Sequence, residues 1–178
     1  MENAKAGSFI SMSLQALSQQ AGIKKATFFH HFPSKNQLAV STLQFASDLL
    51  RDYFSQASHL SPIKQLHHYV QLFEYYLEPT QKVCPSVGFI VDIERHSTEV
   101  IQLVKEYQEL HIHHLTKVLL LGIKQGMLQL QEYQASGLAR GIYFMLQGAL
   151  VSARLTGSRQ DVFECRRSIS DLLGVDLK

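Results

Sequence analysis

A short segment near the start of the chain carries the residue types that contact DNA phosphates and base edges. Between Asn3 and Ser47 the 178-residue sequence contains no aspartate or glutamate. Residues 1–47 hold four basic and one acidic residue, and residues 48–178 hold thirteen basic and fourteen acidic ones. The net charge of +2 is therefore +3 in the first part and −1 in the second. Clustered lysines bind phosphates, so this distribution indicates a nucleic-acid contact.

Two short predicted helices position these basic residues. The first begins after Ser13, a good N-cap, and ends at Gly22, and the second covers about 25–31. Gly22 permits a left-handed turn, and Ile23 is expected to anchor that turn to the core. The pair fits a helix-turn-helix, whose second helix lies in the major groove. The residues expected at base edges are Lys24, Lys25 and Thr27, while Lys35 and the histidines would reach phosphates.

The remainder of the chain also predicts helices, because apolar residues recur at spacings of three and four and strand or hairpin signals are missing. The expected helices cover 34–54, 62–77, 85–93, 100–123, 135–156 and 160–173. The helix at 135–156 has so few polar residues that burial on more than one side is expected. The fold class is therefore all-α.

Several other classes of protein are not favoured by the sequence. Two cysteines cannot form a disulfide scaffold, which favours a reducing cytoplasm. The start is not expected to be a signal peptide, and no membrane span or membrane partner is expected. An enzyme using metal was the first alternative, because His111, His113 and His114 lie close together in the sequence. Ligand spacings typical of di-iron or zinc sites do not occur, so we expect no enzyme, cofactor or metal.

The segment Ser13–Lys35 resembles the DNA-binding segment of TetR-family transcriptional regulators, which typically contains Ala-Gly-Val-Ser-Lys-Gly-Thr-Leu-Tyr-His-His-Phe-Pro-Ser-Lys. This chain has Ala-Gly-Ile-Lys-Lys-Ala-Thr-Phe-Phe-His-His-Phe-Pro-Ser-Lys at residues 21–35. The resemblance implies an N-terminal helix-turn-helix head at 1–46 and a C-terminal effector-binding and dimerisation domain at 47–178. It also implies a homodimeric repressor that binds a palindromic double-stranded operator and is released by a small-molecule effector.

The resemblance assigns DNA-binding positions residue by residue. They are Ser13, Lys24, Lys25, Ala26, Thr27, Phe29, His30 and Lys35. Three of these residues depart from the family's usual pattern. Lys24 replaces a serine cap worth about 1 kcal/mol. Ala26 replaces a glycine, and Phe29 replaces a tyrosine whose hydroxyl typically bonds a phosphate.

The family also places a helix of about four turns before the region of Phe9, where this sequence has eight residues. A missing first helix would uncover apolar residues of the head, and we expect a loosened head for that reason. The alternative function is therefore a helical dimerisation or small-molecule-binding protein that has lost DNA binding.

The remaining predicted sites lie in the C-terminal domain. Aromatic and polar residues at helical spacing are candidates for the effector pocket: Tyr69, Phe73, Phe89, Tyr107, His111, Phe144 and Gln147. Cys84 is a possible sensor thiol, with an ordinary buried cysteine as the alternative. The last two helices are expected to pair with their copies through Gly148, Ala149, Ala153, Phe163 and Ile169.

Overall fold

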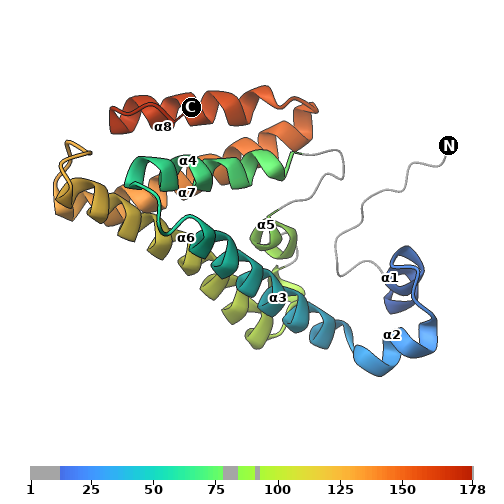
Figure 1. The fold of residues 1–178 in the computed structure, drawn as a ribbon. Coiled ribbons are helices and arrows are strands. Elements are labelled where there is room, and N and C mark those ends of the chain that lie inside the picture. Colours follow the sequence, from blue (N-terminus) through green and yellow to red (C-terminus); the bar gives the residue numbers. More distant parts are fainter. Residues whose placement is uncertain (1–12, 78–83, 91–92, 178) are drawn as a thin grey trace. The chain divides into compact units, whose positions relative to one another are not determined.

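The computed structural model describes residues 13–77, 84–90 and 93–177, and in these ranges helices joined by turns and loops make up the structure, without strands (Figure 1). The all-α prediction is confirmed. The expected end of a helix at Glu78 and the expectation about a missing first helix fall on residues outside the described ranges. None of the described helices is long and apolar enough to cross a bilayer.

The chain divides into two compact units. The first unit consists of Met1–Asp48 and Pro85–Tyr107, and the second of Leu49–Cys84 and Gln108–Lys178. Helices α3 (Lys35–Gln56) and α6 (Thr98–Lys124) each contribute residues to both units. The predicted domain boundary after residue 46 stays a prediction, although residues 85–107 belong to the same unit as the helix-turn-helix.

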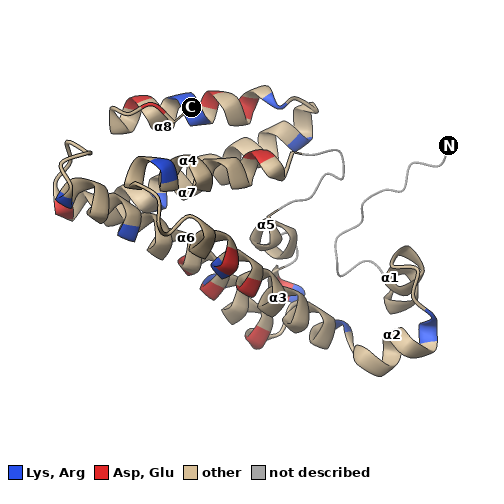
Figure 2. Cartoon of the chain, viewed as in Figure 1, with Lys and Arg blue, Asp and Glu red and all other residues tan. Residues whose placement is uncertain are grey.

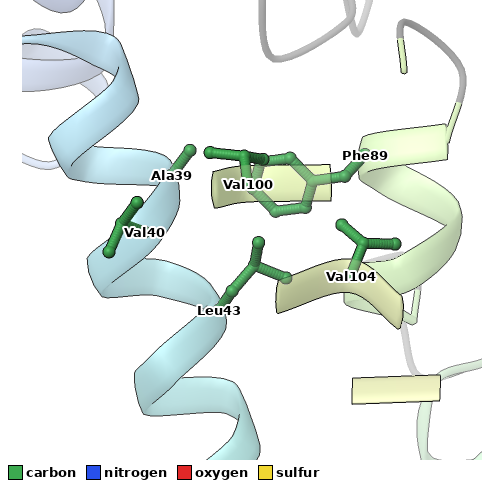
Figure 3. Packing of buried hydrophobic residues seen from close by; sticks show 6 residues of the cluster. All are labelled: Ala39, Val40, Leu43, Phe89, Val100 and Val104. Atoms are coloured by element: carbon green, nitrogen blue, oxygen red, sulfur yellow. The ribbon is translucent and has the colours of Figure 1, made fainter. Parts of the chain in front are cut away.

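In the first unit, the helix-turn-helix consists of α1 (Leu14–Gln20) and α2 (Lys25–His31). The start of α3, the short helix α5 (Pro85–Ile90), the 3₁₀ turn η1 (Ile93–Arg95) and the start of α6 complete the unit. An apolar cluster joins α3, α5 and α6, and Figure 3 shows the side chains that meet in it: Ala39, Val40, Leu43, Phe89, Val100 and Val104. Burial of such side chains contributes about 1.5–3 kcal/mol for each large one.

In the second unit, α4 (Pro62–Tyr75), α7 (Ala135–Thr156) and α8 (Gln160–Leu173) pack on one another, after the 3₁₀ turn η2 (Glu132–Gln134). Local chemistry sets several of these bounds. Pro62 occupies the first position of α4, where its missing N–H costs nothing. Gly157 ends α7 in the left-handed conformation with φ of 69°. The predicted bounds of α7 and α8 agree with the structure.

Helix α7 has one buried face and one exposed face. Its buried side chains recur at helical spacing: Ala135, Ala139, Ile142, Tyr143, Leu146, Leu150 and Ala153. On the opposite side Phe144 and Val151 are about half exposed, at 50% and 51%, and Leu155 is 87% exposed. Burial of α7 on more than one side, expected from its low polarity, is not achieved by the described residues of the chain. The second apolar face of α7 is left uncovered.

Candidate functional site

The turn of the helix-turn-helix is built from local hydrogen bonds. The Ser13 hydroxyl accepts from the backbone N–H of Ala16 at 3.0 Å and caps α1, as its sequence position predicts. Gly22 has a φ of 67°, which confirms its predicted left-handed conformation. The N–H of Ile23 then donates to the carbonyl oxygen of Ser18 at 3.0 Å. These contacts fix the path of the backbone from α1 into α2.

The predicted anchoring of the turn by Ile23 is wrong, because 43% of this side chain is exposed. The buried residues of α1 and α2 are instead Ser18 and Phe28, which are 1% and 5% exposed. The Phe28 ring lies 5.3 Å from that of Phe32, centroid to centroid. Phe28 therefore anchors the second helix, and the rest of that helix is left for contacts with solvent or a partner.

Six of the residues predicted to bind DNA form the exposed surface of α2 and its N-cap: Lys24, Lys25, Ala26, Thr27, Phe29 and His30. Figure 2 shows lysine and no acidic residue on α1 and α2. No carboxylate of these two helices would repel a phosphate. We call this set the α2 face.

Lys25 is held on the α2 face by a neighbour in α1. Its Nζ donates to Oε1 of Gln15 at 3.2 Å and lies 5.7 Å from the centroid of the Phe29 ring. Both contacts orient a long cation that would otherwise sample many rotamers. Gln15 was missed by the sequence reasoning, although its position one turn into α1 follows from the helix-turn-helix register.

Two helix starts flank the α2 face differently. Lys24 provides no side-chain cap for α2, as expected from the loss of the family's serine. The next helix, α3, is capped by Ser34, whose hydroxyl accepts from the N–H of Gln37 at 3.1 Å. Lys35 is the first residue of α3 and is half-buried. A cation beside the N–H groups of a helix N-terminus is a suitable environment for a phosphate.

Three of the residues predicted to bind an effector come together inside the second unit. Tyr69 and Phe73 of α4 and His111 of α6 are buried, and the hydroxyl of Tyr69 is 3.0 Å from Nδ1 of His111. The ring of Phe73 lies 5.5 Å from that of Tyr69 and 6.0 Å from that of His111. Tyr143 of α7 completes this group, with its ring 5.1 Å from that of His111.

Burial holds this polar pair in its uncharged form. Desolvation, with a smaller contribution from His114, lowers the pKa of His111 to about 3. Desolvation, followed by the nearby Tyr143, Cys84 and Tyr76, raises the pKa of Tyr69 well above its usual value. His111 and Tyr69 therefore act as a neutral hydrogen-bonding pair near pH 7. The described residues contain no group of three or more His, Cys, Asp or Glu side chains that could hold a metal ion.

The polar candidate Gln147 lies beside the predicted sensor thiol. Its Nε2 donates to Sγ of Cys84 at 3.0 Å, and Cys84 is fully buried in front of α5. This amide is part of α7, so the hydrogen bond lies within the second unit. A sensor role for Cys84 stays a prediction, and burial would slow the access of an electrophile to its sulfur.

The other effector candidates are placed elsewhere. Phe89 packs in the apolar cluster of the first unit. Tyr107 is buried and is the last residue of α6 that belongs to the first unit. Phe144 lies on the exposed side of α7, whereas its neighbour Tyr143 points inward. Sequence reasoning missed Tyr143, although the period of Ala139, Ile142 and Leu146 places it on the buried face.

Two grooves occur among the described residues of the second unit. A groove of about 730 Å³ lies between α8 and the C-terminal segment, lined by Phe163, Arg166, Arg167, Ser170 and residues 171 and 174–177. Another, of about 500 Å³, lies along the start of α4 beside His67 and His68. Neither groove is lined by a predicted effector residue, and the roles of those residues stay predictions.

The predicted dimer residues occupy several environments. Ala153 and Ile169 are buried within the chain, and Ala149 is half-buried. Gly148 lies on the exposed side of α7. Phe163 is 40% exposed but lies 5.9 Å from both Arg159 and Arg166, measured from ring centroid to guanidinium carbon. Of this set, Gly148 is the residue on the uncovered face of α7.

Comparisons with known proteins agree with this geometry. Residues 5–42 match the family described as bacterial regulatory proteins, tetR family. The structure is similar to that of a TetR-family transcriptional regulator from Agrobacterium tumefaciens, with a TM-score of 0.85 at 26% identity over 94% of this chain and 89% of that one. A TetR transcriptional regulator from Legionella pneumophila gives a TM-score of 0.81 at 23% identity over 93% and 88% of the two chains. The search of curated proteins found no match.

The chain is thus an all-helical protein with a helix-turn-helix at its N-terminal end, the architecture of a DNA-binding transcription regulator. Its DNA-binding segment is that of the TetR family, and the chain as a whole has the TetR fold. The resemblance read from residues 13–35 is confirmed.

Proposed function

We propose that the protein is a transcriptional regulator that binds a palindromic operator as a homodimer and responds to a small molecule. The observation that carries this proposal is the α2 face, where two lysines, a threonine and a histidine are exposed on a short helix without a carboxylate. The anchoring of α2 by Phe28 leaves that face free for the major groove.

The side chains on the α2 face divide into two kinds of contact. Thr27 and Lys25 lie in the first turn, where a recognition helix approaches base edges. Lys24, the N-cap of α2, lies beside them, while His30 and Lys35 provide sequence-independent contacts with phosphates. Phe29 lacks a hydroxyl and would pack against the sugar-phosphate edge instead.

A second copy of this chain is the proposed occupant of the uncovered face of α7. Along that face, residues recur at spacings of four and three: Gly137, Gly141, Phe144, Gly148, Val151 and Leu155. We call this the α7 stripe. A Cβ atom built on any of its three glycines meets no atom within 4 Å among the described residues. Glycine in a helix interior costs about 1 kcal/mol relative to alanine, and no neighbour in the described part of the chain requires it.

Close approach of a second helix would require these glycines, and spacings of four and three are those of a helix-helix seam. Two heads related by a two-fold axis would read a palindrome, with recognition helices about 34 Å apart or somewhat more. A regulator of this kind would act in the cytoplasm, where bacterial DNA is found.

The effector is proposed to be an uncharged, largely apolar small molecule. The buried group of Tyr69, Phe73, His111 and Tyr143 contains aromatic rings and one neutral hydrogen-bonding pair. A charged ligand would lose its hydration there without gaining an ion pair. We infer that binding at this group changes the operator affinity.

Selection from a random duplex library tests DNA binding. The wild-type protein is expected to enrich a palindrome, and Thr27→Ala is expected to change the preferred bases while retaining binding to unrelated duplexes. His113→Gln, an exposed substitution on α6, is the matched control and should enrich the same sequence. Failure of the wild type to enrich any sequence would favour the alternative of a helical protein without DNA binding.

Matched probes test the effector class. We expect 2-naphthol to raise the melting temperature of the protein and 2-naphthoate, its charged analogue, to leave it unchanged. Phe73→Ala should remove the effect of 2-naphthol. Equal stabilisation by both probes would contradict an uncharged site.

A further inference from the structure

The first turn of α3 is tied to the first turn of α6 by a polar clamp within the first unit. Asn36 follows Lys35 and is the second residue of α3. The hydroxyl of Ser97 donates to Oδ1 of Asn36, and Nδ2 of Asn36 donates to Oε2 of Glu99 at 3.4 Å. Both polar atoms of the Asn36 amide are therefore engaged by residues more than sixty positions away in the sequence.

Ser97 serves both helices through one oxygen atom. Besides donating to Asn36, its hydroxyl oxygen accepts from the N–H of Val100 at 3.3 Å, so it caps the start of α6. Ser97 can satisfy both partners because a hydroxyl has one proton to donate and lone pairs to accept. The geometry of the α6 cap and that of the α3 start are thereby linked.

The clamp acts where the apolar packing of α3 does not reach. The apolar cluster begins at Ala39 and continues through Val40 and Leu43, and so holds α3 from its second turn onward. Lys35 and Asn36 precede that cluster. The Ser34 cap and the Asn36 clamp are side-chain hydrogen bonds that hold this first turn.

We propose that Asn36 is a positioning residue, which orients the first turn of α3 so that Lys35 meets a DNA phosphate. This inference rests on the proposed DNA-binding function. It assigns a part in operator affinity to Ser97, which caps α6, and to Glu99 of α6, although both lie far from the helix-turn-helix in sequence. A displacement of the α6 start would reach Lys35 through these hydrogen bonds.

A double-mutant cycle on the selected operator duplex tests the proposal. Asn36→Ala is expected to weaken binding about fivefold, since a net hydrogen bond is worth about 1 kcal/mol. In a Lys35→Ala background, Asn36→Ala should change affinity less than about twofold, because the group it positions is gone. Thr42→Ala is the control, because the Thr42 hydroxyl donates to Leu38 O of its own helix.

Rescue by a rearranged pair separates positioning from a general loss of stability. Asn36→Asp places a carboxylate beside Glu99 and should weaken operator binding, and adding Glu99→Gln should restore most of it, because the new amide donates to the new carboxylate. The restored variant has the wild-type net charge, so nonspecific electrostatics are matched. Melting temperatures of all variants measure any loss of folding.

Failure of the positioning role can be distinguished from failure of the proposed DNA-binding function. Additive effects of Asn36→Ala and Lys35→Ala, or wild-type affinity of Asn36→Ala, would overturn the positioning role while leaving DNA binding intact. Absence of operator binding by the wild-type protein would overturn both proposals together.

Discussion

Helices α2 and α7 each leave one face uncovered, and the two faces have opposite chemistry. The α2 face presents lysines, a threonine and a histidine on a helix anchored by one buried phenylalanine. The α7 stripe presents three glycines and the apolar residues Phe144, Val151 and Leu155 on a helix with seven buried residues on its other side. An uncovered polar face suits a hydrated, charged partner, and an uncovered apolar face suits a dry one.

Helices α2 and α7 also differ in their length and in how their ends are capped. Seven-residue α2 has no side-chain cap, and its stability depends on packing against α1. The 22-residue α7 ends in a left-handed glycine and lies against α8 and α4. A short helix presents few side chains to a groove, whereas a long one supplies a continuous seam. The two faces are therefore expected to fail in different ways when they are mutated.

The largest effect is expected from a substitution that disrupts the α7 stripe. Gly148→Leu should weaken dimerisation more than a hundredfold, because two leucines, one from each copy, would occupy a close helix contact. The same substitution should stabilise the isolated chain by about 0.5–1 kcal/mol, since leucine favours helix over glycine and meets open space there. Sedimentation equilibrium measures the first effect, and urea unfolding at low concentration measures the second.

Tyr133→Ser provides the control for this change, because Tyr133 is a highly exposed aromatic residue on η2, outside the α7 stripe. It should leave the dimer unchanged. An unaltered dimer in Gly148→Leu would show that the second copy binds elsewhere.

The stability of the second unit should respond to acid through two histidines of α6. His111 has a folded pKa of about 3 and His114 one of about 4, while both would titrate near 6.5 in the unfolded chain. The stability they maintain is complete above pH 6.5 and falls as the pH drops from 6.5 through 4, because protons bind the unfolded state preferentially. At pH 4.5 buried His111 alone should lower the free energy of unfolding by roughly 3 kcal/mol.

Urea denaturation at a series of pH values measures this loss. His114 stacks on Phe54 at 3.8 Å, so His114→Phe keeps the stack. It should reduce the pH dependence between 6.5 and 4 without abolishing it, because the contribution of buried His111 remains. Exposed His113 serves as the control, and His113→Gln should leave the dependence as it is. A pH profile that is flat in the wild type would contradict the neutral buried pair.

A smaller effect is expected at the edge of the α2 face. Lys35→Ala should weaken binding to all duplexes by about five- to tenfold and reduce the salt slope by about one, because one phosphate contact is lost. Fluorescence anisotropy at several salt concentrations measures both quantities. Lys117→Ala, an exposed lysine of α6 in the second unit, is the control. An unchanged salt slope in Lys35→Ala would remove the phosphate role.

The smallest effect is expected from a substitution that adds a single oxygen atom to the α2 face. Phe29→Tyr would restore the hydroxyl that typically bonds a phosphate in the family, and operator affinity should rise by about two- to fivefold. The ring would keep its place beside Lys25. An affinity equal to that of the wild type would show that residue 29 packs away from the phosphates.

The helices could be predicted from the sequence wherever their ends depend on local chemistry. Ser13, Ser34, Pro62 and Gly157 each mark a helix end that the structure confirms. These residues act through hydrogen bonds or backbone angles within a few positions, so their effect does not require knowledge of the fold.

The sites could be predicted only in part, because burial depends on distant segments. Ile23 was expected to be buried, but Phe28 anchors the motif and Ile23 is exposed. Phe144 was chosen for the effector pocket, whereas the helix phase turns it outward and brings Tyr143 in. The Asn36 clamp joins residues more than sixty positions apart, and no local pattern in the sequence reveals it.

The open space above the glycines of the α7 stripe has a consequence for the amount of protein. If the proposed dimer forms through it, a helix with three interior glycines and exposed apolar side chains would be stabilised by the bound copy and left weaker without it. By mass action the melting temperature of such a protein rises with its own concentration. At low protein concentration most molecules would then lack a partner, and they would be the least stable and the first to be degraded. The abundance of the regulator would therefore be coupled to its own assembly.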